Sequence, residues 1–147
     1  MLTRLRSDEN RDGGFSLIEI LVVIIIIGIL AAIAIPLLLN QRKKAADASL
    51  KEDIHTLATK EETYFSDFSV YNAVVSATGN VAFATETVTL SKGNTVSVSL
   101  NTAGTAYCIL ASNPQGTNAP PAGWVYVSSK GGMQPATTTS CPTASSF

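Results

Sequence analysis

Hydrophobic side chains follow one another almost without interruption from Leu17 to Leu39. Between Ile20 and Leu39 no side chain is charged or strongly polar. The 25 residues from Phe15 to Leu39 would form about 37 Å of α-helix, which exceeds the ~30 Å hydrocarbon core of a bilayer. The pattern therefore predicts a membrane-spanning helix over residues 15–39.

A secretory signal peptide is the competing interpretation, because Ala31-Ala32-Ile33-Ala34 contains an Ala-x-Ala sequence. The apolar core of such a peptide is only about 7–15 residues and ends at the cleavage site. Here the apolar run is longer and continues beyond these alanines. The pattern therefore favours a membrane-spanning helix over a signal peptide.

After Leu39 the hydrophobic residues recur at helical spacings of three, four and seven. They are Leu50, Ile54, Leu57, Tyr64, Phe65 and Phe68. The charged residues between them are expected to form a solvated face: Arg42, Lys43, Lys44, Asp47, Lys51, Glu52, Asp53, Lys60, Glu61 and Glu62. We therefore expect one helix from about Phe15 to about Phe65, amphipathic over residues 40–68. Gly28 and Pro36 should weaken it, with a kink or local loosening near Ala32.

Residues 69–147 show β-type patterns instead. Four strands are predicted: Val81–Leu90, Thr95–Leu100, Ala106–Ala111 and Trp124–Ser128. The turn residues 91–94 should join the first two as a hairpin, and residues 113–123, rich in Pro and Gly, form a loop. The predicted fold class is α+β, with the helix packed on a four-stranded antiparallel sheet.

The composition argues against nucleic-acid binding and against catalysis. The net charge is −1, and no clustered basic face is evident. Phosphate-binding, zinc-protease and serine-hydrolase motifs are absent. His55 is the only histidine and is expected on a solvated flank, while Glu61, Glu62 and Asp67 resemble a hydrated helix face. We predict that the chain is not an enzyme and that it has no cofactor and no metal site.

The two cysteines, Cys108 and Cys141, allow a single intrachain pairing. If the C-terminal region lies outside the cytoplasm, a disulfide is favoured and would attach the C-terminal tail to the sheet. Two unpaired thiols are the alternative. A zinc site is disfavoured by one His and two distant Cys residues.

Glu19 is the one charged residue inside the predicted anchor. An acidic or basic side chain at the centre of a membrane helix costs about 2.5–3.5 kcal/mol. Near the helix end the carboxylate could reach the headgroups instead. A different interpretation is that it needs a positive partner. A cut between Gly14 and Phe15 would create an α-amino group four residues before Glu19, able to pair within the chain or with Glu19 of a neighbouring copy.

The stretch Gly-Phe-Ser-Leu-Ile-Glu, preceded by a short charged leader and followed by Gly28 and Pro36, resembles the class III signal of type IV pilins and pseudopilins. The resemblance covers roughly residues 13–64. It implies that a prepilin peptidase removes leader 1–14 by cutting after Gly14 and N-methylates Phe15. It also implies that Glu19 aligns subunits, that the helix near Pro36 melts in the filament, and that Cys108 and Cys141 form the disulfide common near pilin C-termini.

Charge alone leaves the orientation open, because the three arginines before the span are balanced by Arg42-Lys43-Lys44 after it. The resemblance implies a cytoplasmic leader and an external head. It further implies a precursor in the cytoplasmic membrane, assembly by a platform protein and an ATPase, and a homo-oligomeric filament on the cell surface. The short leader is similar to that of the a-class pilins.

The function predicted is that of a pilus subunit for adhesion, twitching motility or DNA uptake. A pseudopilin of a type II secretion or competence system is the alternative within the family. A single-pass membrane-anchored binding protein is the alternative outside it. Binding of DNA by the head has no support in any motif.

Overall fold

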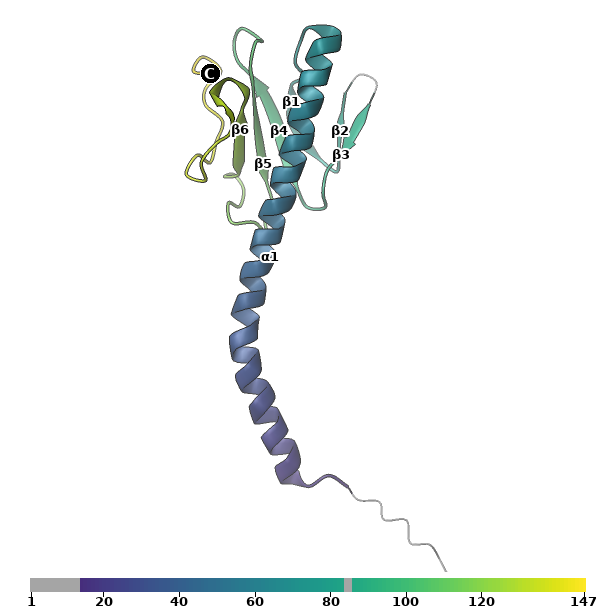
Figure 1. Cartoon of the computed structure of the whole chain (residues 1–147), viewed down its shortest axis with the longest axis vertical. Coiled ribbons are helices and arrows are strands. Elements are labelled where there is room, and N and C mark those ends of the chain that lie inside the picture. Colours follow the sequence, from purple (N-terminus) through teal and green to yellow (C-terminus); the bar gives the residue numbers. More distant parts are fainter. Residues whose placement is uncertain (1–13, 84–85) are drawn as a thin grey trace, which may run out of the picture. The chain divides into compact units, whose positions relative to one another are not determined.

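The computed structural model describes residues 14–83 and 86–147. The chain divides after Leu38 into two compact units, and we call the second, Leu39–Phe147, the head unit. Helix α1, Leu17–Phe68, begins in the first unit and ends in the second (Figure 1). Its ends agree with the prediction to within three residues, and it stays helical through Gly28 and Pro36. A proline removes only one backbone donor, which a long apolar helix tolerates.

The head unit contains a five-stranded antiparallel sheet in the order β1-β4-β5-β6-β7 (Figure 1). The strands are β1 (Val74–Thr78), β4 (Thr95–Leu100), β5 (Tyr107–Ser112), β6 (Trp124–Val127) and β7 (Gly132–Met133). A separate two-stranded sheet pairs β2 (Asn80–Ala82) with β3 (Thr87–Thr89), and the short helix η1 (Ser128–Lys130) follows β6. The α+β class is confirmed, with five strands in the main sheet where four were predicted.

The predicted hairpin between Val81–Leu90 and Thr95–Leu100 is wrong. The first run splits into β2 and β3, which pair with each other through Val81 and Val88. The turn after it does form, with Gly93 at φ 85, but it links strands of two different sheets. The neighbours of β4 are β1 and β5. Strand β1 was missed because its pairing with β4 shifts register between Val74 and Ala77, so it lacks a clean alternation.

One face of the main sheet packs against the head part of α1. Leu50, Ile54 and Leu57 are fully buried there, together with Val96 and Ile109 of the sheet. These residues form the main hydrophobic core, and their burial is the largest favourable contribution to the packing of helix on sheet.

The C-terminal tail covers the opposite face of the sheet. Val125 and Val127 are buried there in a second cluster with Cys108, flanked by Cys141 and Phe147 of the tail. The disulfide between Cys108 and Cys141 is present in the structure and links the tail to β5. Because β5 lies between helix and tail, five of its six residues are buried rather than every second one.

Candidate functional site

The first turn of α1 carries the residues that the sequence singled out. The Ser16 amide donates a hydrogen bond of 2.8 Å to Oε2 of Glu19, and the Glu19 amide donates one of 3.3 Å to Oγ of Ser16. This reciprocal arrangement is a capping box, in which two amides at the start of the helix gain side-chain acceptors. The carboxylate of Glu19 is thereby directed back towards the start of the helix.

Sequence reasoning missed the role of Ser16. The signal was present, because Ser16-Leu17-Ile18-Glu19 has the Ser-x-x-Glu spacing of a capping box immediately before an apolar run. The structure therefore changes the interpretation of Glu19: one of its oxygens is already used within its own chain. Gly14 and Phe15 precede the helix, and Phe15 is 82% exposed. Leader residues 1–13 lie outside the described residues.

The anchor, residues 15–39, presents its apolar side chains to the surroundings. Helix α1 contains an 18-residue window of mean hydropathy 3.3, long and apolar enough to cross a membrane, and none of that window is buried within the chain. Exposed apolar surface on this scale requires a cover, either lipid or another protein.

Three acidic residues of the predicted solvated face are instead buried against the head. Asp47, Asp53 and Glu61 are 8%, 6% and 0% exposed. Asp47 lies three residues before Leu50, and Glu61 lies four residues after Leu57, so both continue the buried stripe at helical spacing. This helical spacing was the feature of the sequence from which their burial could have been predicted. The prediction failed because it assigned residues to a face by charge alone.

Asp47 anchors the loop between β5 and β6 to the helix. Its Oδ1 accepts hydrogen bonds from the Thr117 amide at 2.9 Å and the Trp124 indole at 3.1 Å, and its Oδ2 accepts from the Thr117 hydroxyl. Burial alone would raise the pKa of this carboxyl, but these donors and the charge of Lys51 outweigh it and hold the pKa below its usual value.

Asp53 anchors the turn before β4 in a similar way. It accepts hydrogen bonds from the Ser91 amide and hydroxyl, both at 2.9 Å, and from Nδ2 of Asn94 at 2.7 Å. Asn94 in turn accepts a bond of 2.7 Å from Asn113. The carboxylate therefore joins α1 to a turn whose residues Ser91 and Asn94 lie 38 and 41 positions later in the sequence.

Only one of the two carboxylate oxygens of Glu61 accepts a hydrogen bond from a described residue. Its Oε2 accepts a 2.8 Å hydrogen bond from the Asn72 amide, while Oε1 is buried and has no hydrogen-bond partner among the described residues. Desolvation, together with the negative charge of Glu62, raises the pKa of Glu61 to about 7.

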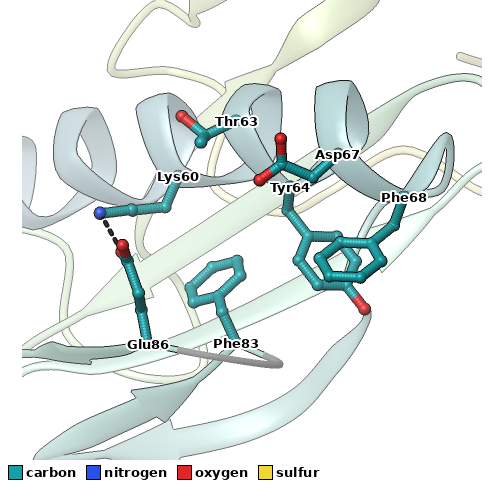
Figure 2. Close-up of a pocket in the computed structure, with 7 residues that line it drawn as sticks. All are labelled: Lys60, Thr63, Tyr64, Asp67, Phe68, Phe83 and Glu86. Carbon is teal, nitrogen blue, oxygen red and sulfur yellow. Dashed lines mark hydrogen bonds and ion pairs between the residues drawn. The ribbon is translucent and has the colours of Figure 1, made fainter.

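The last turns of α1 border a small aromatic pocket. Figure 2 shows Tyr64 and Phe68 of the helix beside Phe83, with Lys60 forming an ion pair to Glu86. The pocket volume is only about 40 Å³. Asp67 lines this pocket, and His55 is exposed on the helix. In residues 14–83 and 86–147 no group of three His, Cys, Asp or Glu side chains could hold a metal ion.

These features define a class of protein: a single apolar anchor helix that begins in a capped Phe-Ser-x-x-Glu motif and continues into an α+β head. The sequence profile of the prokaryotic N-terminal methylation motif matches residues 10–35. The type IV wide pilus major component PilA4 of Thermus thermophilus is 35% identical over 71% of this chain and 76% of its own length. The chain belongs to the type IV pilin family.

Two further relatives match over shorter regions. The type IV major pilin protein PilA of Myxococcus xanthus is 36% identical over 52% of this chain, and the type II secretion system core protein G of Dickeya chrysanthemi is 40% identical over 43%. The matched regions span 34% and 41% of these two relatives. No solved structure gives a significant match to the chain.

Proposed function

We propose that this chain is the structural subunit of a type IV pilus filament, and that its role is not catalytic. The observation that supports this most is the extent of the similarity. It covers 104 residues of a wide pilus major component, whereas the match to the type II secretion core protein of Dickeya covers 63 residues. A match of 104 residues exceeds the length of α1, so the similarity to the pilus component includes part of the head.

Processing of the precursor is part of the proposal. A prepilin peptidase cuts between Gly14 and Phe15 and methylates the new amino group of Phe15. The methylation-motif profile, which encloses this bond, supports the assignment. The cut places a positive charge one residue before Ser16, whose amide holds Oε2 of Glu19.

Glu19 then aligns subunits during assembly. The capping box turns its carboxylate towards the start of the helix, where an offset neighbour would bring its own amino terminus. In the low-dielectric environment of packed apolar helices an unpaired carboxylate is costly, so pairing favours one axial register. Melting of the helix near Gly28 and Pro36 within the filament remains part of this proposal.

In this scheme the exposed anchor side chains are covered both before and after assembly. Lipid covers them while the precursor waits as a single-pass protein of the cytoplasmic membrane with its head outside. Other copies of the chain cover them in the surface filament, after a platform protein and an ATPase have driven extraction. The filament would serve adhesion, twitching motility or DNA uptake.

A pseudopilin of a type II secretion or competence system is the second candidate. It is favoured by the 40% identity to the core protein G of Dickeya, which is higher than the identity to either pilus protein. A single-pass binding protein would require neither the cut after Gly14 nor Glu19.

The test is to shear filaments from the cell surface and determine the N-terminus and mass of their main subunit. An N-methylated Phe15 start in long surface filaments is the expected result. An intact Met1 in a monomeric membrane fraction contradicts the proposal. Absence of surface filaments, with loss of a secreted enzyme when the chain is deleted, would assign the pseudopilin role instead.

A further inference from the structure

The apolar stripe of α1 extends beyond the part that the head buries. It is fully buried as far as Leu57, but Phe65 and Phe68, which continue it at helical spacing, are 37% and 48% exposed. Val70, just after the helix, is 53% exposed. Among the described residues after Leu39 these three are the only exposed large apolar side chains. We call them the end patch, and clustered exposed apolar side chains of this kind mark a binding surface.

The charge around the end patch is negative. Asp67 lines the same pocket as Phe68 (Figure 2), and Glu62, held in place by two tyrosine hydroxyls, precedes the patch by one turn. Neither carboxylate forms an ion pair within the described residues, and the nearby cation Lys60 is already paired with Glu86. The last turn of α1 contains no basic residue, so the partial negative charge of the helix end adds to that of the carboxylates. Exposed aromatic rings beside unpaired carboxylates suit a cationic partner, through cation–π contacts and ion pairs.

The chain itself carries a cationic segment of this kind at the other end of the head part of α1. Arg42, Lys43 and Lys44 are consecutive and exposed, and none forms an ion pair in the part of the chain that the structure describes. About 33 Å of continuous helix separates Lys43 from Phe65, at roughly 1.5 Å per residue. Both ends belong to the head unit. The segment therefore cannot reach the end patch of its own chain, but the segment of another copy can.

We propose that the end patch of one copy binds the Arg42-Lys43-Lys44 segment of another copy in the filament. The contact joins two different surfaces, so each copy uses its end patch towards one neighbour and its basic segment towards another. A contact of this heterologous type builds an open filament when its rotation does not close a ring. The inference rests on the proposed function, because it names the surface through which the heads of neighbouring subunits meet.

A zero-length carbodiimide cross-linker, which joins a carboxylate to an amine in contact with it, tests the interface in sheared filaments. Mass analysis of the linked peptides should show Asp67 of one copy joined to Lys43 or Lys44 of another. Lys43→Gln/Lys44→Gln should lower the yield of covalent dimers linked through Asp67 at least tenfold. The matched control Lys92→Gln/Lys130→Gln removes the same charge elsewhere in the head and should leave this yield unchanged. Filaments in which Asp67 is linked to no lysine of this segment would overturn the proposal.

Exchange of charge separates pairing from folding. Asp67→Lys places a cation at the end of the helix, where it is favourable, so the variant should unfold no more readily than the wild type. We nevertheless expect its filament yield, normalised to processed subunit, to fall at least tenfold. Arg42→Glu/Lys43→Glu should cause a similar loss, and the combination of both changes should recover at least threefold over either alone.

Three other outcomes would contradict the proposal. Wild-type filament yields in both charge variants, or no recovery in their combination, would overturn the pairing while leaving the filament itself established. A link from Asp67 to a different protein would overturn the second copy as the partner. Absence of filaments from the wild type would contradict the proposed function, and with it this interface.

Discussion

The carboxyl group of Glu61 lies fully buried near the end of α1. It has one hydrogen bond, from the Asn72 amide, and one oxygen without a partner. The negative charge of the neighbouring Glu62 is also unfavourable to ionisation of Glu61. The buried carboxyl is therefore more easily accommodated when protonated.

This environment predicts a pH dependence of stability. The folded-state pKa of about 7 lies above the ordinary value of 4.5, so the folded chain binds the proton more tightly than the unfolded chain. The stability that Glu61 contributes is complete below about pH 4.5 and is lost as the pH rises through 7. The difference is at most roughly 3 kcal/mol in the free energy of unfolding.

Glu61→Gln should flatten this pH dependence and make the head more stable than the wild type at pH 8. Denaturant unfolding of the full chain in detergent at pH 5 and pH 8 measures it, with Trp124 emission as the probe. The exposed Glu52→Gln is the control and should keep the wild-type slope. An unchanged slope in Glu61→Gln would show that Glu61 is already ionised in the folded state.

At the scale of the element, the proposed function assigns a second role to the four residues of the capping box at the start of α1. The capping box needs a hydrogen-bond acceptor at position 19, whereas the alignment of subunits that we propose needs a negative charge there. Glutamine supplies the acceptor without the charge, and alanine supplies neither. The two roles can therefore be separated by substitution.

We expect Glu19→Gln and Glu19→Ala both to lose their leader normally and both to fail to enter filaments. Ser16→Ala keeps the charge but loses one half of the capping box, at a cost of roughly 1 kcal/mol, and should assemble nearly as well as the wild type. Filament yield after shearing, normalised to processed subunit in the membrane, is the measurement. Normal assembly of Glu19→Gln combined with failure of Ser16→Ala would mean that capping, not charge, is required.

At the scale of the whole molecule, the tail as well as the helix closes the head unit, each over its own hydrophobic cluster. The Thr102 amide donates to the Ala144 carbonyl, the Gly123 amide donates to the Thr139 carbonyl, and Cys141 is bonded to Cys108. Without these contacts Val125 and Val127, now fully buried, would face water. The disulfide thus keeps the second core covered.

Replacing both cysteines by serine should lower the free energy of unfolding by about 3–4 kcal/mol, the loop-closure value expected for residues 33 apart. Equilibrium unfolding of the double variant against the wild type measures this. Mass analysis of a non-reduced digest should show the peptides of Cys108 and Cys141 linked. Alkylation of both thiols in the folded wild type would refute the linkage.

Local patterns in the sequence were sufficient for the long helix, the anchor and the α+β class. An unbroken apolar run has only a few physical solutions, and Leu50, Ile54 and Leu57 specify a buried stripe by their spacing alone. Strands β4, β5 and β6 were also close to their predicted positions. Each of these features depends on residues that are neighbours in the chain.

Contacts between residues distant in sequence decided the rest. β4 pairs with β1 and β5 because of packing across the head unit, which no local alternation encodes. Asp47, Asp53 and Glu61 are buried because backbone amides and side chains 11 to 77 residues away face them. The sequence by itself determined that the chain has an apolar anchor with one charged residue, Glu19, near its start. Only the tertiary structure decided which charges are buried, because burial depends on the donors that the fold brings to each carboxylate.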